Sequence, residues 1–163
     1  VACNFTTNRM LTDYINQYYV PQSARYDGLV ADDFAQAREM ASWKKKLRRE
    51  WNNVEVVSAQ MPDSNSDKIA IGNDFNAEVV LNIGDLSPEE IGVEVLFAAT
   101  DKKGRLHIQE TYEFSPVECS DGRARYTAAI NPDTSGLYQV AGRIYAKNPK
   151  MPHRQDFELV RWL

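Results

Sequence analysis

Residues 43–58 read WKKKLRREWNNVEVVS, and this stretch decides the fold because the hydrophobic period changes within it. From Val54 onward apolar and polar residues alternate, which is typical of a half-buried strand. Before that point three apolar residues recur every four positions and share one side of a helix: Trp43, Leu47 and Trp51. The stretch therefore predicts a helical segment over residues 1–53 and a β-domain over residues 54–163.

Two helices are expected in the first segment. The first covers residues 5–20, with Thr7 as a candidate N-cap and Pro21 as its stop. A polar connection over 21–28 leads to a second helix, which begins at Asp32 or Asp33 and runs to about Trp51. An apolar and aromatic face follows the 3-and-4 spacing of the first helix: Met10, Leu11, Tyr14, Ile15 and Tyr18.

After residue 53 the chain is rich in turns, with short alternating stretches and no helical pattern between them. Asp101–Gly104 reads as a hairpin turn. About eight strands are expected, near 54–58, 69–71, 75–83, 93–100, 105–114, 123–130, 137–146 and 157–162. The predicted class is mainly β, an antiparallel sandwich of immunoglobulin-like size preceded by two α-helices.

The composition is that of an ordinary globular chain. It has 163 residues, 43% hydrophobic and 26% charged, with a net charge of -4. Residues 1–53 carry a net charge of +2 and the remainder -6. There is no apolar run long enough for a membrane helix and no pattern of a signal peptide. We therefore expect a cytoplasmic protein with neither a membrane nor a nucleic acid as its partner.

Cysteines and histidines are too few and too scattered to predict a metal site. Cys3 and Cys119 are the two cysteines, and we expect unpaired thiols in a reducing compartment. His107 and His153 lie far apart in the sequence, and neither is near a cysteine. Zinc requires three or four clustered ligands, so no metal is expected.

No motif of a catalytic nucleophile, a phosphate-binding loop or a metalloprotease occurs in the chain. Glu89 and Glu90 are adjacent acids of a kind that is usually solvated. The basic run Lys44–Arg49 is either a phosphate or nucleic-acid patch or, as we favour, the solvated end of an amphipathic helix. The sequence therefore nominates no catalytic residue.

Aromatic residues are the only candidates for carbohydrate or interface contacts. Trp43 and Trp51 are either a platform on which sugars stack or, as helical spacing favours, packing residues. The strand tyrosines either form a face that binds carbohydrate or, as we favour, occupy a mixture of core and surface positions: Tyr112, Tyr126, Tyr138 and Tyr145. The loop 148–157, NPKMPHRQDF, is either a plain basic loop or an anion contact through Lys150, His153 and Arg154.

Three ordered motifs carry a resemblance to a known family. Residues 5–14, FTTNRMLTDY, resemble the FSSDRTIxxY segment near the C-terminus of α-glucan phosphorylases, with Asn8 and Met10 as departures. Residues 43–54 resemble the WKxx[LV]xxxWxxV pattern of the bacterial and archaeal branch with an extended C-terminus. Residues 86–94, LSPEEIGVE, resemble LxPEDVxVE in the β-domain of that branch.

The resemblance implies a C-terminal fragment of an enzyme that cleaves α-1,4-glucans with phosphate and releases glucose 1-phosphate. In that family pyridoxal phosphate is bound to a lysine upstream of these motifs, so the resemblance implies neither a cofactor nor a catalytic residue in this chain. Residues 1–53 would be the tail of the catalytic domain and residues 54–163 a C-terminal β-domain. The expected partners are the remainder of the parent, an α-glucan, or a second copy through the exposed helical faces. A carbohydrate-binding or protein-interaction module is the alternative.

Overall fold

A computed structural model describes residues 6–62, 75–132 and 137–163 of the chain. The chain divides into two compact units, Val1–Lys45 and Lys46–Leu163. Within the described ranges none of the helices combines the length and the apolar character that a membrane span needs.

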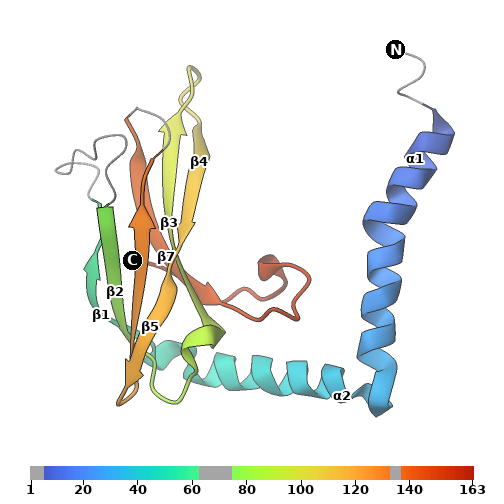
Figure 1. The fold of residues 1–163 in the computed structure, drawn as a ribbon, viewed down its shortest axis with the longest axis horizontal. Helices are drawn as coiled ribbons and strands as arrows, with labels where there is room; N and C mark the ends of the chain where they lie inside the picture. The colour runs from blue at the N-terminus through green and yellow to red at the C-terminus, as the bar shows by residue number, and fades with distance from the viewer. Residues whose placement is uncertain (1–5, 63–74, 133–136) are drawn as a thin grey trace. The chain divides into compact units, whose positions relative to one another are not determined.

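The first unit is helical (Figure 1). Helix α1 (Thr7–Tyr14) is capped by Thr6, whose hydroxyl accepts a hydrogen bond from the backbone N–H of Arg9 at 3.3 Å. The N-cap is therefore one residue earlier than the expected Thr7. A π-helical turn, Ile15–Tyr19, joins α1 to α2 (Val20–Glu50).

Pro21 does not end the first helix, so this prediction was wrong. The residue lies in the first turn of α2, directly after the π-helical turn. A proline ring normally clashes with the carbonyl four residues earlier and removes one hydrogen bond. The wider π turn, in which the N–H of Val20 bonds to the carbonyl of Ile15, relieves that crowding. Helical structure then continues past Gly28 to residue 30.

The regular helix breaks at Ala31–Phe34. Ala31 has an extended ψ of 153°, and Asp32, Asp33 and Phe34 have φ values of 51°, 52° and 61°. Side chains on L-residues disfavour this left-handed region. The helical stretch expected from Asp32 or Asp33 therefore begins after Phe34, and two helical stretches are present, as the sequence predicts.

The second unit contains two four-stranded antiparallel sheets (Figure 1). In the first sheet the strand order is β1-β2-β6-β5, and in the second it is β4-β3-β7-β8. The bounds are β1 (Glu55–Gln60), β2 (Phe75–Asn82), β3 (Ile91–Thr100), β4 (Leu106–Glu113), β5 (Ser115–Ser120), β6 (Arg123–Ile130), β7 (Gln139–Ala146) and β8 (Val160–Trp162). The mainly β class with antiparallel sheets after helices is confirmed.

The core of this unit lies between the two sheets and around the end of α2, where the chain enters β1. Arg161 donates hydrogen bonds to the backbone carbonyls of Trp51 and Val54, which fixes the short 3-10 turn Trp51–Asn53 against β8. The fully buried side chains include Leu47, Val54, Val79, Leu81, Val93, Val95, Tyr126, Ile130 and Ile144.

The expected and the observed strands differ in two places. The strand predicted at 69–71 lies outside the described residues. Strand β5 was not predicted, because all its residues are exposed and its pairing with β6 shifts register between Pro116 and Glu118. A proline and a bulge of this kind are typical of an edge strand and remove the alternation that would reveal it.

Candidate functional site

One row of side chains crosses all four strands of the second sheet. Glu94 on β3 is paired with Glu113 on β4 and with Arg143 on β7, and Arg143 is paired with Trp162 on β8. These residues share one face because directly paired positions in a sheet point the same way. Two carboxylates placed side by side repel each other, so the row requires cations.

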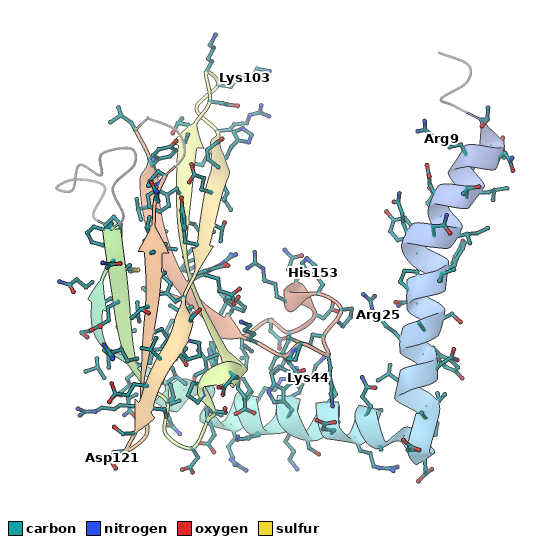
Figure 2. The ribbon with its side chains drawn as sticks, in the orientation of Figure 1. Arg9, Arg25, Lys44, Lys103, Asp121 and His153 are labelled. Carbon is teal, nitrogen blue, oxygen red and sulfur yellow. The ribbon has the colours of Figure 1, made fainter. Side chains whose placement is uncertain are left out.

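Glu94 is buried, with 2% of its surface exposed, and is held by two arginines. Arg143 is ion-paired with one carboxylate oxygen, and Arg154 lies 2.6 Å from the other. Arg154 comes from the 3-10 turn η5 (Arg154–Asp156) in the loop before β8, which Figure 2 marks by His153. A buried carboxylate needs such partners, because losing one leaves an uncompensated charge.

Glu113 is the second acid of the row and lies at the surface. Lys147 Nζ is 2.6 Å from its carboxylate, and the Tyr145 hydroxyl donates a hydrogen bond to it at 3.0 Å. Burial raises the pKa of Glu113, but the hydrogen bonds from Lys147 and Tyr145 outweigh it, so the pKa is lowered overall. Glu113 is therefore an ionised acceptor at neutral pH.

Tyr145 forms the floor beside this pair. Its ring lies across Gly92 on the neighbouring strand, and a Cβ at Gly92 would collide with that ring. The guanidinium of Arg154 lies over the same ring, 5.4 Å from its centroid. Burial, and then the nearby Glu113, raise the pKa of the Tyr145 phenol to about 12. The ring is thus fixed in one position and remains a hydrogen-bond donor.

A small cavity of about 170 Å³ opens at the end of β7. Its polar lining consists of Glu113, Lys147, Asn148 and Arg154, and Tyr145 and Met151 supply apolar walls. The side-chain oxygen of Asn148 accepts a hydrogen bond from the Lys150 N–H at 2.9 Å, which orients the amide. Donors, an acceptor and an aromatic ring therefore meet in one place.

The aromatic residues nominated by the sequence fall into three groups. Trp43, Trp51 and Tyr126 are buried, and the Tyr126 hydroxyl donates a hydrogen bond to the Pro88 carbonyl. Burial also raises the pKa of the Tyr126 phenol. No ring face remains on Trp51 or Tyr126 for a sugar, because both side chains pack in the core.

Tyr112 and Tyr138 are brought together. Both are half-buried and meet the ring of Phe97 edge-on, with centroid distances of 5.7 and 5.8 Å. The Tyr112 hydroxyl also donates to the Asn131 carbonyl at 2.8 Å. Tyr145 lies on the opposite face of the sheet, because its partner Gly92 is offset by an odd number of residues from Phe97. The four strand tyrosines therefore do not form one binding face.

Trp162 is the functional candidate that sequence reasoning missed. Its side chain is 58% exposed, and the guanidinium of Arg143 lies 5.6 Å from its ring. A short alternation of Val160, Arg161 and Trp162 was the only signal in the sequence. The pairing that places Trp162 beside Arg143 depends on β7, which is distant in sequence.

Two cations of the basic run Lys44–Arg49 are ion-paired with acids that are distant in sequence. Lys46 is 2.9 Å from Glu90, and Arg48 is 3.3 Å from Glu158 and lies over the ring of Phe157. These contacts favour the helix-end interpretation over a free phosphate patch. Lys150, His153 and Arg154 of the loop 148–157 do not act as one anion site, since Arg154 binds Glu94 and His153 caps η5.

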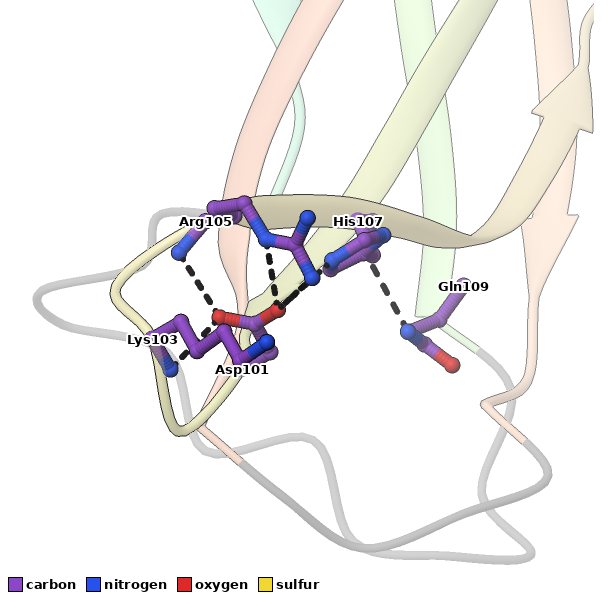
Figure 3. Close-up of polar contacts among 5 residues, drawn as sticks. All are labelled: Asp101, Lys103, Arg105, His107 and Gln109. Atoms are coloured by element: carbon purple, nitrogen blue, oxygen red, sulfur yellow. Dashed lines mark hydrogen bonds and ion pairs between the residues drawn. The ribbon is translucent and has the colours of Figure 1, made fainter.

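The hairpin between β3 and β4 is built by Asp101 (Figure 3). The Asp101 carboxylate accepts hydrogen bonds from the backbone N–H groups of Lys103 and Arg105, at 2.8 and 2.9 Å. His107 Nε2 lies 3.0 Å from the same carboxylate. The backbone hydrogen bond from Arg105 lowers the pKa of Asp101. This cluster confirms the expected hairpin turn and has the chemistry of a turn rather than of a catalytic site.

Neither a metal nor pyridoxal phosphate fits the side chains that the structure describes. Groups of three or more potential ligands among His, Cys, Asp and Glu do not occur in residues 6–62, 75–132 and 137–163. A lysine that forms a Schiff base is usually desolvated in a pocket. The described lysines are exposed or of intermediate exposure, and Lys46 and Lys147 are in ion pairs.

Residues 51–163 match the family described as the glycogen phosphorylase C-terminal domain. The chain belongs to this family. Maltodextrin phosphorylase of Thermococcus litoralis is 26% identical over 166 aligned positions, which cover 99% of this chain and 19% of the relative. Glycogen phosphorylases of Mycobacterium bovis and Mycobacterium tuberculosis are each 21% identical over 157 positions, which cover 94% of this chain and 18% of theirs.

The chain therefore spans about a fifth of the length of the curated relatives that it matches. No solved structure is significantly similar to it. The family membership agrees with the resemblance carried by the three motifs. The matched residues contain the whole of the motif at 86–94 and the end of the motif at 43–54.

Proposed function

We propose that this chain is the C-terminal accessory region of an α-glucan phosphorylase. The full-length enzyme would cleave α-1,4-glucan with phosphate and release glucose 1-phosphate, and this region would be inactive alone. The observation that carries the proposal is the family match over residues 51–163, together with phosphorylase relatives that align with nearly the whole chain. Pyridoxal phosphate and its lysine would belong to another part of the parent, which would be cytoplasmic.

Residues 1–53 would be the tail of the catalytic domain and residues 54–163 the β-domain. Support for this division comes from the exposed apolar face of the first unit, where five side chains are each about half exposed: Met10, Leu11, Tyr14, Ile15 and Tyr18. Contiguous exposed apolar surface usually marks an interface. The remainder of the parent would cover this face, and a second copy is the alternative partner.

An immunoglobulin-like topology is part of the proposal. The strand orders β1-β2-β6-β5 and β4-β3-β7-β8 correspond to A-B-E-D and C′-C-F-G when the eight strands are lettered in chain order. This strand order supports an immunoglobulin-like topology. A solved structure of the unit would test it directly.

The experiment is an assay of glucose 1-phosphate with maltoheptaose and inorganic phosphate as substrates. We expect product from the full-length protein encoded by the same gene and none from the purified 163-residue chain. A catalytically competent chain without any other polypeptide would overturn the proposal. Absence of product from the full-length protein, with its cofactor loaded, would also overturn it.

A second function, binding of carbohydrate by the β-domain, is favoured by one observation. The second sheet presents an exposed tryptophan, Trp162, beside a row of fixed polar groups on the same face. The two functions are compatible, because an accessory region can hold the substrate of its parent.

A further inference from the structure

The cavity at the end of β7 is small and polar. Its volume of about 170 Å³ equals that of roughly six liquid water molecules. Such a space accommodates one small ring rather than a chain or a large cofactor. Within the described residues it is formed by β4, β7 and the loop that follows β7.

The lining carries donors and acceptors side by side. Glu113 accepts hydrogen bonds, Lys147 and Arg154 donate them, and the Asn148 amide can do both. The side chains of Glu113 and Lys147 are both 45% exposed, so both remain open to solvent. A ligand with adjacent hydroxyl groups matches this lining, because each hydroxyl can both donate and accept a hydrogen bond.

The charges disfavour an anion as the ligand. Lys147 is neutralised by Glu113, and Arg154 is neutralised by Glu94. Each cation of the lining is therefore already paired with a carboxylate, and no excess positive charge remains to attract a phosphate or carboxylate group. A neutral polyhydroxylated ring needs no such charge.

The groups are also held in place before a ligand arrives. Arg154 is fixed by the buried Glu94 and by the Tyr145 ring, and Tyr145 is fixed against Gly92 and by its hydrogen bond to Glu113. Fixed groups lose little entropy on binding. Trp162 lies on the same face of the sheet, and its paired residue Arg143 is two residues before Tyr145 on β7.

We propose that this cavity, beside Glu113, Lys147 and Arg154, binds one glucosyl unit of an α-1,4-glucan, and that Trp162 provides a stacking surface for an adjacent unit. The choice of glucan among neutral sugars rests on the proposed function. The site retains glucan at the accessory region and takes no part in bond cleavage.

The test is a titration of the whole ¹⁵N-labelled chain with methyl α-glucoside, maltotriose, cellotriose and inorganic phosphate, followed by NMR. We expect maltotriose to bind with a dissociation constant on the order of 1 mM. The shifted amides should belong to residues 113 and 145–154, and the indole signal of Trp162 should shift as well. Cellotriose and phosphate should leave these signals unchanged at the same concentrations.

Two variants of the lining, one variant at Trp162 and one matched control test the proposal further. Glu113→Gln removes a charged acceptor and should weaken maltotriose binding about tenfold. Asn148→Ala, which lies outside the ion pairs, should weaken it several-fold and guards against a folding defect in the first variant. Glu118→Gln removes an exposed carboxylate that is ion-paired with Arg125 in the other sheet and should change nothing. Trp162→Ala should weaken maltotriose but not methyl α-glucoside.

Three outcomes would overturn the proposal. They are the absence of any shift with maltotriose at roughly ten times the expected dissociation constant, shifts confined to another surface, and shifts of the same amides by phosphate. None of these outcomes would contradict the proposed function, because phosphorolysis by the full-length protein is measured separately. Loss of that activity would, in turn, leave a glucan-binding chain intact.

Discussion

The two units solve the burial of apolar side chains in opposite ways. In the first unit Leu11 is 49% exposed, together with the aromatic residues around it. In the second unit Leu47 is 0% exposed, and even a carboxylate, Glu94, is enclosed and matched by two arginines. The second unit thus encloses its own apolar side chains, whereas the first unit leaves an apolar face about half exposed. The difference is what we expect where an accessory domain follows the tail of another domain.

The same substitution in the two units gives the largest contrast. Leu47→Ala should lower the free energy of unfolding by about 4 kcal/mol, because it removes a fully buried side chain and leaves a cavity. Leu11→Ala should change it by less than about 0.5 kcal/mol, since that side chain is half exposed. Urea denaturation followed by tryptophan fluorescence measures both. Equal losses of unfolding free energy in the two variants would show that the first unit has a core of its own and would contradict the contrast between the units.

The buried charge of the second unit gives the next effect. Arg143→Ala leaves Glu94 enclosed with one cation fewer and should cost about 3 kcal/mol. Arg123→Ala, an exposed position on β6, should cost less than about 0.5 kcal/mol. Thermal denaturation of both variants provides the measurement. If Arg143→Ala matches its control, Glu94 is not the enclosed charge described above.

Replacing either of two glycines with alanine should change stability in opposite directions. Gly92→Ala places a Cβ into the ring of Tyr145 and should destabilise the second unit by about 2 kcal/mol. Gly28→Ala adds a Cβ inside a helix, where its nearest neighbour is the flexible end of Gln36 at 3.2 Å, and should stabilise that helix by up to about 1 kcal/mol. Circular dichroism melts resolve the two signs. A stabilised Gly92→Ala variant would contradict the packing of Tyr145.

The smallest effect concerns pH. The pKa of Glu113 is lowered below its ordinary value of 4.5, so its contribution to stability is fully present above pH 4.5 and is lost as pH falls through the folded-state pKa. Because the side chain is 45% exposed, the contribution should stay below about 1 kcal/mol. Stability measured from pH 6 to roughly pH 3 should fall less steeply in Glu113→Gln than in the wild type. Identical slopes would mean that Lys147 and Tyr145 do not hold this carboxylate.

Local patterns predicted much of the fold. The change of period near Val54, the alternation around Val79 and the turn at Asp101 each depend on neighbouring residues, and each is found in the structure. Pro21 was misread because its effect depends on the π turn before it, which leaves no mark in the sequence. Strand β5 was missed because an exposed, bulged edge strand lacks alternation.

The candidate site was beyond reach of the sequence for a different reason. The row Glu113, Glu94, Arg143 and Trp162 exists only because four strands, separated by up to 68 positions, pair in one register. Tyr145 was nominated as an aromatic residue, but its role as a fixed floor depends on Gly92 and Arg154. Periodicity indicates which side of a strand a residue occupies, and it does not indicate which strand lies beside it.

Hydrogen–deuterium exchange tests the central contrast most directly, with the 163-residue chain and the full-length protein compared under the same conditions. Amides of residues 46–62, 75–132 and 139–162 should be equally protected in both, because the second unit has a complete core. Amides of residues 7–20 should gain protection only in the full-length protein, where we propose that the rest of the parent covers Met10, Tyr14 and Tyr18. Equal protection of residues 7–20 in the dilute chain alone, or loss of protection in the second unit, would contradict the account.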